Sequence, residues 1–441
     1  MTQKRRVLIL GGGFAGLKAA QKLKRAPVEV TLIDRRNFHL FQPLLYQVAT
    51  GSLSPGEISA PLRSVLSKQK NAQVLLGEAA DIDPDAKRVI LRDGASFPYD
   101  SLIVATGSKT SYYGNDSWRD YAPSLKTVEE ATAIRHKILY AFEWAERAPT
   151  IQEAREWLTF VIIGAGATGL ELAGALAEIA YETLKNDFRR INPKDARILL
   201  MEGGPRVLPA YPPDLSEKAE KLVTRLGVEV MKNVMATAVD SNGVTYKRGD
   251  ATEKLAAKTV LWAGGVVATT FGKKLAERTR SETERNGRMK VKADLTIPNY
   301  PDIFVVGDLA AAVDAKSGKT LPGVAQVAIQ GGSYAAKIIR ARLQGKKDLP
   351  PFHYFDKGDM AVIGRAAAVA NIFGMHVSGL PAWLIWLFIH LMYIVEFQNR
   401  VLVFVQWGFE YLTFSRGARL ITGSGDPDLP TPPTSPNRTI P

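Results

Sequence analysis

Apolar residues gather along this chain in short continuous runs, several of which are followed at once by a segment with helical spacing. The runs at 7–10 and 160–163 are each followed by glycines and then by a helix-like pattern. Further apolar runs, at 100–104 and 259–262, also end at a glycine or lead to one. Short apolar runs that alternate with helices are typical of buried parallel strands. The pattern therefore predicts an α/β fold.

Two glycine-rich loops follow these runs with the same G-x-G-x-x-G spacing. The glycines are Gly11, Gly13 and Gly16 in the first loop, and Gly164, Gly166 and Gly169 in the second. The first glycine allows a tight turn, the second lets the backbone approach a pyrophosphate, and the third lets the helix pack against the strand. The helix start that follows favours an anion. Two copies about 150 residues apart predict two Rossmann-like dinucleotide-binding domains.

An acidic residue ends the second strand of each unit. Asp34 ends the run 28–34, and Glu202 ends the run 197–202. A carboxylate there accepts a hydrogen bond from a ribose hydroxyl, suits the free 2′-OH of NADH and repels the 2′-phosphate of NADPH. Arg206 follows closely, so NADPH is disfavoured and not excluded. The alternative interpretation is that one of the two sites is vestigial.

The order of the strands predicts that the second unit is inserted into the first, because an apolar strand followed by Gly307 and Asp308 resumes the first unit. A long helix is expected at about 168–190. The predicted segments are the first domain (1–122), a helical connection (123–156), the second dinucleotide domain (157–297), the return to the first domain (298–370), C-terminal amphipathic helices (371–420) and a disordered tail (421–441).

The composition of the chain excludes several kinds of redox centre and binding partner. The 441 residues include no Cys, which excludes disulfides, iron–sulfur clusters and thiol-based electron acceptors. The five His have no metal-ligand spacing, so no metal is expected. The formal net charge is +13 without any nucleic-acid-binding motif, which favours an anionic membrane surface or solvated faces over nucleic acid.

The C-terminal segment predicts contact with a membrane. Residues 380–395 carry no formal charge, yet as a helix they reach roughly 24 Å, short of the hydrocarbon core of about 30 Å. The run at 401–414 is amphipathic and contains Trp407 and Tyr411. Two short helices with interfacial aromatics indicate a monotopic anchor. The alternatives are one transmembrane span within 372–395 and a buried core helix.

Together these features resemble the two-dinucleotide-binding-domain flavoprotein reductases and, among them, the type II NADH:quinone oxidoreductases. The more specific stretches are Phe-Gln-Pro-Leu-Leu-Tyr at 41–46 and Ala-Gln-Val-Ala-Ile-Gln at 325–330. The resemblance covers about residues 5–420. Small departures are Ala165 and Ala167, where family members often carry Gly and Pro. Both alanines are small, so pyrophosphate binding is still expected.

The resemblance implies non-covalent FAD in the first unit and NADH in the second. It also implies reduction of a lipophilic quinone without proton pumping, a homodimer, and a peripheral position on the cytoplasmic face of the inner membrane. The residues expected to contact FAD are Gly11, Gly13, Phe14, Ala15, Gly16, Asp34, Arg35, Gln42, Thr50, Ala105, Thr106, Gly107, Gly307 and Asp308. Those expected to contact NADH are Gly164, Gly166, Thr168, Gly169, Glu202, Gly264 and Gly265.

The candidate catalytic residues are Glu171, Gln326 and Gln330. Glu171 lies in the first turn of the second nucleotide helix, where the resemblance assigns it to the nicotinamide and to quinone protonation; the alternative is helix-dipole complementation. Gln326 and Gln330 share a helix face and can donate to quinone carbonyls, or else are only surface polar residues. Ile329 and Tyr46 are expected in the apolar walls of the quinone site.

Two other functions fit the same residues. One is a soluble NADH oxidase that passes electrons to oxygen. The other is a redox-sensing flavoprotein of the apoptosis-inducing-factor type. Without cysteine, all three send electrons directly from the flavin to an acceptor outside the chain.

Overall fold

The computed structural model describes residues 4–346 and 349–421, so the tail predicted at 421–441 lies outside the described residues except for Ile421. The first unit is built on a six-stranded sheet, which is parallel except at its β20 edge. Its strands in spatial order are β20 (Thr296–Ile297), β21 (Tyr300–Val305), β9 (Ser101–Val104), β1 (Arg5–Leu10), β2 (Val28–Asp34) and β5 (Ala72–Leu76). Its helices are α1 (Phe14–Lys22), α2 (Leu45–Ala49), α3 (Leu62–Leu66), α8 (Thr270–Thr279) and α9 (Ala325–Leu343).

The second unit has a four-stranded parallel sheet. Its strands in spatial order are β13 (Val228–Met231), β12 (Arg197–Met201), β11 (Thr159–Ile163) and β17 (Thr259–Trp262). Helices α6 (Ala167–Glu178) and α7 (Pro213–Arg225) flank it, together with the antiparallel strands β14 (Val234–Asp240), β15 (Gly243–Arg248) and β16 (Ala251–Ala256).

The second unit is inserted into the first. Strands β9 and β21 pair in parallel, with Leu102 opposite Ile303, although the whole second sheet lies between them in the sequence. Helices α4 (Val128–Arg147) and α5 (Ile151–Trp157) lead into the second unit. The predicted α/β fold with one Rossmann-like unit inside the other is therefore confirmed.

Shorter strands complete the two units. They are β3 (Phe38–Leu40) with β4 (Ser59–Pro61), β6 (Ala79–Asp83) with β7 (Arg88–Leu91) and β8 (Ser96–Pro98), β10 (Ser108–Thr110) with β18 (Val266–Ala268), and β19 (Met289–Lys290) with β22 (Ala310–Ala311). The β10–β18 pair joins the first unit to the second, because Ser108 lies opposite Ala268.

The helix expected at 168–190 ends earlier. After α6 the chain makes one π-helical turn over Ile179–Thr183. The backbone N–H groups of Arg189, Arg190 and Ile191 then donate to the carboxylate of Glu146 on α4. This anchor fixes the chain against α4, where a continued helix would have to point away.

A three-stranded antiparallel sheet precedes the C-terminal helices and was not predicted. Its strands are β23 (Asp359–Gly364), β24 (Ala367–Ile372) and β25 (Met375–Ser378). Residues 371–378, which were expected to be helical, belong to this sheet because Phe373 and Gly374 form a hairpin turn with positive φ. The sheet packs on the second unit: a Cβ at Gly174 of α6 would lie 1.6 Å from the Ile363 carbonyl oxygen.

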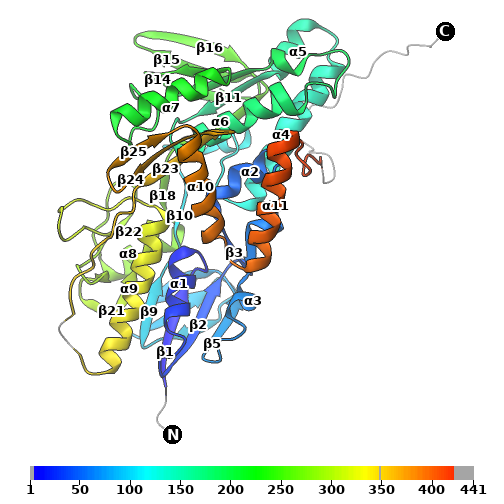
Figure 1. The fold of residues 1–441 in the computed structure, drawn as a ribbon. Coiled ribbons are helices and arrows are strands. Elements are labelled where there is room, and N and C mark those ends of the chain that lie inside the picture. Colours follow the sequence, from blue (N-terminus) through cyan, green and yellow to red (C-terminus); the bar gives the residue numbers. More distant parts are fainter. Residues whose placement is uncertain (1–3, 347–348, 422–441) are drawn as a thin grey trace.

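Two helices follow, α10 (Leu380–Tyr393) and α11 (Phe397–Thr413), and lie side by side along the molecule (Figure 1). Neither these nor any other helix in the described ranges is long and apolar enough to cross a membrane, so the alternative of one span within 372–395 is wrong. Both helices expose apolar side chains: Leu380, Leu384, Phe388, Met392, Phe397, Val401, Leu402, Phe404, Val405, Phe409 and Leu412. Trp386 and Trp407 instead face inward and are buried.

Candidate active site

The two glycine loops have nearly the same backbone. Gly11 and Gly164 have φ of +103° and +106°, a conformation that side chains other than glycine rarely adopt. A Cβ at Gly16 would lie 1.8 Å from the Gly11 carbonyl oxygen, and one at Gly169 would lie 1.9 Å from that of Gly164. The third glycine of each motif is therefore required by the close packing of the helix on its own loop.

The second glycine of each motif borders open space. Gly13 and Gly166 precede α1 and α6, neither helix has a side-chain cap at this end, and a Cβ added at either glycine would meet no atom within 4 Å. Uncapped backbone N–H groups next to open space fit a pyrophosphate. The residues present thus fit a dinucleotide at each loop.

The two acids hold these loops in the same way. The carboxylate of Asp34 accepts hydrogen bonds from the Gly12 N–H at 2.5 Å and from the Arg36 N–H at 2.7 Å. Glu202 accepts from the Ala165 N–H at 2.9 Å and from the Gly204 N–H at 2.8 Å. Each acid therefore shapes the loop that binds the pyrophosphate, and its remaining lone pairs can accept from a ribose hydroxyl.

Arg206, which could have accommodated a 2′-phosphate, is held elsewhere. Its guanidinium donates to the Pro209 carbonyl oxygen at 2.8 Å, and no ion pair joins it to Glu202 within the described part of the chain. The Glu202 carboxylate is thus left without a compensating cation beside it, which favours NADH over NADPH.

An open cleft of about 2570 Å³ runs between the two units. Most of the predicted cofactor residues line it: Gly11, Gly13, Phe14, Ala15, Asp34, Arg35, Gln42, Ala105, Thr106, Gly107, Thr168, Gly264, Gly265, Gly307 and Asp308. Tyr46 and Glu171 line it too. The remaining glycines, Gly16, Gly164, Gly166 and Gly169, and Glu202 do not line this cleft.

Asp308 has two neighbours that the sequence motifs did not indicate. Its carboxylate accepts a hydrogen bond from the Ser108 hydroxyl at 2.8 Å and lies 3.4 Å from the Lys126 ammonium. Lys126 is itself fixed, because its carbonyl oxygen accepts from the Gln42 side chain at 3.1 Å. Neither neighbour belongs to a recognisable motif: Ser108 begins strand β10, and Lys126 follows Ser124, which forms an isolated β-bridge with Trp262.

Helix α6 has no acidic residue in its first turn, so Glu171 lies one turn further along the helix than the sequence indicated, and its carboxyl group has a strongly shifted pKa. Burial raises the pKa of its carboxyl group to about 8, although a hydrogen bond from the Val362 backbone N–H opposes the shift. A carboxyl group with this pKa is mostly protonated at neutral pH and can donate a proton. Val362 belongs to the unpredicted sheet, so sequence patterns gave no sign of this contact.

A second, smaller cavity lies beneath α10 and α11. Its walls include the aromatic side chains of Trp383, Trp386, Trp407 and Tyr411. Tyr46 and Glu171 line this cavity as well as the cleft, so they stand where the two spaces adjoin. The sequence did not predict that these tryptophans face inward, because composition alone does not tell which face of a helix is buried.

A chain of polar contacts connects Tyr46 to α11. The Gln47 side chain donates to the Tyr46 hydroxyl at 2.8 Å and accepts from the indole N–H of Trp407 at 2.7 Å. Burial raises the pKa of Tyr46 well above its usual value, so the phenol stays neutral. The Tyr46 phenol therefore adds no charge to the smaller cavity.

Thr50 is not brought to the cleft. Its hydroxyl donates to the Tyr46 carbonyl oxygen at 2.8 Å, and its own carbonyl accepts from the buried Arg416 guanidinium at 3.3 Å. Arg416 also forms an ion pair with Glu178 at 2.7 Å. Thr50 thus helps to fasten the C-terminal segment to the body of the protein, a role distinct from the predicted FAD contact.

The glutamine motif lies at the start of α9, but its two amides differ. Gln326 has a buried side-chain oxygen without a hydrogen-bond partner in the described structure, next to Ala325, which lines the cleft. Gln330 instead uses both amide atoms on the Phe355 backbone, each at 2.9 Å. Neither glutamine lines either cavity, and nor does Ile329, whose carbonyl accepts from Ser333.

Comparison with known proteins agrees with this arrangement. Residues 5–332 match the family described as pyridine nucleotide-disulphide oxidoreductase, and residues 357–416 match the NDH2 C-terminal domain. The second match covers the unpredicted sheet together with α10 and α11. It therefore marks these elements as one unit of a known kind.

Relatives of similar length carry a more specific name. The chain is 46% identical to the type II NADH:quinone oxidoreductase Ndh of Mycobacterium tuberculosis, over 95% of this chain and 91% of the relative. It is 32% identical to the type II NADH:quinone oxidoreductase of Staphylococcus saprophyticus, over 86% of this chain and 92% of the relative.

Solved structures show the same fold at lower identity. The NDH2 of Plasmodium falciparum in complex with NADH superposes with a TM-score of 0.85 at 21% identity, over 94% of this chain and 99% of that one. The sulfide:quinone oxidoreductase of Aquifex aeolicus gives a TM-score of 0.73 at 20% identity, over 90% and 92%. On the family matches and the two relatives, the chain belongs to the type II NADH:quinone oxidoreductases.

Proposed function

We propose that NADH is oxidised at FAD in the cleft and that a quinone is reduced where the smaller cavity adjoins it. The observation that carries this proposal is that Tyr46 and Glu171 line both spaces. A donor and an acceptor of electrons can then approach the same flavin from two different sides. FAD, when bound, supplies the acceptance of a hydride and its release as two electrons.

The two nucleotides are assigned by the two loops. Gly11, Gly13 and Asp34 would hold the adenosine half and pyrophosphate of FAD, and Asp308 with Ser108 would hold its ribityl chain. Gly166 and Glu202 would hold NADH. Gly264 and Gly265 line the cleft from the second unit, and their small size suits close approach of the nicotinamide.

The smaller cavity is suited to a lipophilic quinone. Its walls combine the tryptophans of α10 and α11 with the neutral Tyr46. Quinol formation consumes protons, and Glu171, with a pKa of about 8, can supply one next to the cavity. Gln326 remains a proposed quinone contact on the strength of its unpartnered buried oxygen. Gln330 and Ile329 would affect quinone binding indirectly, by fixing the position of α9.

Membrane association follows from the same two helices. The exposed apolar side chains of α10 and α11 lie on short helices, the arrangement expected of a helix pair that lies in the plane of a bilayer surface. A quinone could then enter the smaller cavity from the lipid. We further propose a homodimer on the cytoplasmic face of the inner membrane, as the family resemblance implies.

The decisive experiment is anaerobic oxidation of NADH by FAD-loaded protein, with and without a short-chain quinone. Fast turnover that depends on the quinone is expected. Flavin reduction that then stalls in the presence of quinone would contradict the proposal. A stalled reduced flavin that is rapidly reoxidised by oxygen would indicate an NADH oxidase, and a stable NADH–flavin complex with slow turnover would indicate a redox sensor.

A further inference from the structure

Arg365 occupies an unusual position beside the smaller cavity. It begins the turn between β23 and β24, which continues through Ala366 with a φ of +55°. Its backbone N–H donates to the Glu178 carboxylate at 2.6 Å. The turn is thereby fastened to the end of α6, so the position of Arg365 is fixed by the core of the protein.

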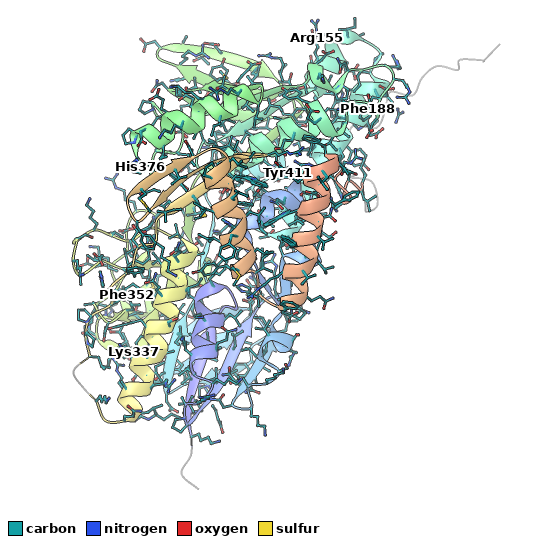
Figure 2. The ribbon with its side chains drawn as sticks, viewed as in Figure 1. Arg155, Phe188, Lys337, Phe352, His376 and Tyr411 are labelled. Carbon is teal, nitrogen blue, oxygen red and sulfur yellow. The ribbon has the colours of Figure 1, made fainter. Side chains whose placement is uncertain are left out.

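The guanidinium of Arg365 lies between two aromatic rings. Its central carbon is 4.0 Å from the centre of the Tyr411 ring and 4.1 Å from the centre of the Phe414 ring. Figure 2 shows Tyr411 between α10 and α11. Two cation–π contacts hold the group in place without using its N–H donors in conventional hydrogen bonds.

Those donors have no acceptor among the described residues: no hydrogen bond or ion pair of the Arg365 guanidinium joins it to them. The nearby carboxylate of Glu178 accepts from the Arg365 backbone N–H and pairs with Arg416 at 2.7 Å, and it forms no hydrogen bond or ion pair with the Arg365 guanidinium. Arg416 is buried and satisfied, whereas Arg365 keeps five free donors and an uncompensated charge.

The other charged groups of the cavity do not cancel this charge. Glu171 and Glu410 both have a pKa raised by burial, so each carries less negative charge than an ordinary glutamate. The Glu410 carboxyl accepts hydrogen bonds from the Ser52 hydroxyl and from the Gln406 amide. Arg416 and Glu178 pair with each other, so neither of them pairs with the Arg365 guanidinium.

Arg365 also adjoins the apolar face proposed to meet the bilayer. On α11, Phe409 and Leu412 flank Tyr411 with 55% and 80% of their surface exposed, and on α10 Leu380 and Leu384 are about half exposed. A cation beside such a face lies at the depth of the lipid headgroups once the face rests on a membrane. Guanidinium groups bind phosphate through two parallel N–H···O bonds.

We propose that Arg365, held between Tyr411 and Phe414, binds the phosphate of an anionic phospholipid at the edge of the smaller cavity. The proposal rests on the membrane association given above as part of the function. It adds a specific headgroup contact to a surface that would otherwise bind by apolar contact alone. An anionic lipid is favoured over a zwitterionic one because the Arg365 guanidinium has no ion-pair partner among the described residues.

The test is flotation of the full-length, FAD-loaded protein with vesicles of phosphatidylcholine, alone or with phosphatidylglycerol, at fixed ionic strength. The variant is Arg365→Gln, and the matched control is Arg155→Gln. Arg155 is exposed on α5, away from Tyr411 in Figure 2, so both variants lose one positive charge. FAD absorbance and thermal unfolding verify that each variant is folded, and Arg365→Lys keeps the charge without the planar fork.

The phosphatidylglycerol-dependent part of binding should fall about 5-fold in Arg365→Gln, from about 1 kcal/mol per arginine at an anionic surface, with an intermediate value for Arg365→Lys and little change in Arg155→Gln. Equal losses in Arg365→Gln and Arg155→Gln would overturn the site. Displacement of the wild type from vesicles by inorganic phosphate would also overturn it, because the site would then bind free phosphate and not a lipid headgroup. Failure of the wild type to bind either vesicle would instead refute membrane association itself.

Discussion

The carboxyl group of Glu171 accepts a hydrogen bond from the backbone N–H of Val362, and this contact joins the second nucleotide helix to the C-terminal sheet. Glu171 thus belongs at once to the unit that would bind NADH and to the wall of the cavity beneath α10 and α11. A change of charge at this carboxyl group would change the electrostatic potential in both the cleft and the smaller cavity. The most direct predictions concern its protonation.

Replacing Glu171 by Gln should remove the pH dependence of quinone reduction in the neutral to alkaline range. If the protonated carboxyl group, with a pKa of about 8, is the proton donor as proposed, the wild-type rate should be level at lower pH and fall above about pH 8. Stopped-flow reoxidation of reduced flavin by quinone between pH 6 and 9.5 measures this. A wild-type decline that persists unchanged in Glu171→Gln would assign the titration to another group.

The same residue should make stability depend on pH. Since the folded-state pKa of Glu171 lies above the ordinary value of 4.5, the folded protein binds this proton more tightly than the unfolded chain does. The contribution is full below about pH 4.5 and is lost as pH rises towards 8. The free energy of unfolding of the wild type should therefore fall relative to that of Glu171→Gln across this window in urea titrations. A difference that stays constant with pH would show that the carboxyl group is not perturbed.

Substitutions in the two glycine loops should impair the binding of different nucleotides. Gly16→Ala places a Cβ 1.8 Å from the Gly11 carbonyl and should yield protein with little bound FAD. Gly169→Ala makes the equivalent clash at Gly164 and should retain FAD that dithionite reduces, with reduction by NADH slowed at least about tenfold, because displacing the loop loses roughly one good phosphate contact. Gly56→Ala, whose Cβ meets nothing within 4 Å, is the neutral control. Loss of FAD from Gly169→Ala as well would reverse the assignment of the loops.

Gln330 and Gln326 should behave differently. Gln330→Ala removes two partly solvated hydrogen bonds to Phe355 and should lower the free energy of unfolding by about 1 kcal/mol, with faster proteolysis near residue 355. Gln326→Ala should leave stability nearly unchanged and raise the KM for quinone. If Gln330→Ala is as stable as the wild type but impaired with quinone, then its amide reaches the substrate after a rearrangement.

Arg416 should be essential for holding α11 against the rest of the protein. Arg416→Met leaves the Glu178 carboxylate without its partner in a poorly hydrated place, which costs about 3 kcal/mol. The double variant Arg416→Met with Glu178→Gln should recover part of the loss, as chemical denaturation of the two proteins can show. No recovery would mean that packing of the arginine stem, and not its charge, is what matters.

Local features of this protein could be predicted and long-range ones could not. The glycine loops and the two acids follow from the strand, turn and helix that surround them in sequence, so Gly11, Asp34, Gly166 and Glu202 were found directly. The sheet β23–β25 was missed because its strands are only four to six residues long and β24 is half Ala. Everything that depends on this sheet, including the contact of Val362 with Glu171, was missed with it.

The sequence predicted where the two glutamines lie on their helix but not which groups they contact. Helical spacing placed Gln326 and Gln330 on one face, as the structure has them on α9. Spacing does not tell what crosses that face, and the segment that carries Phe355 crosses it at Gln330. The same limit applies to Lys126 beside Asp308, since Lys126 is held there by contacts far apart in the sequence, including the hydrogen bond from the Gln42 side chain to its carbonyl oxygen.

Helix α6 gives a final consequence. It begins at the second glycine loop, carries Glu171 just after its first turn and ends at Glu178, which is tied to Arg416 and to the turn at Arg365. Seven residues of helix separate the two glutamates, or roughly 10 Å. The length of the helix thus sets the distance between the loop proposed to bind NADH and the turn that carries Arg365, and one inserted residue would turn its far end by about 100°. Relatives should accordingly tolerate changes in loops far better than any change in the length of this rod.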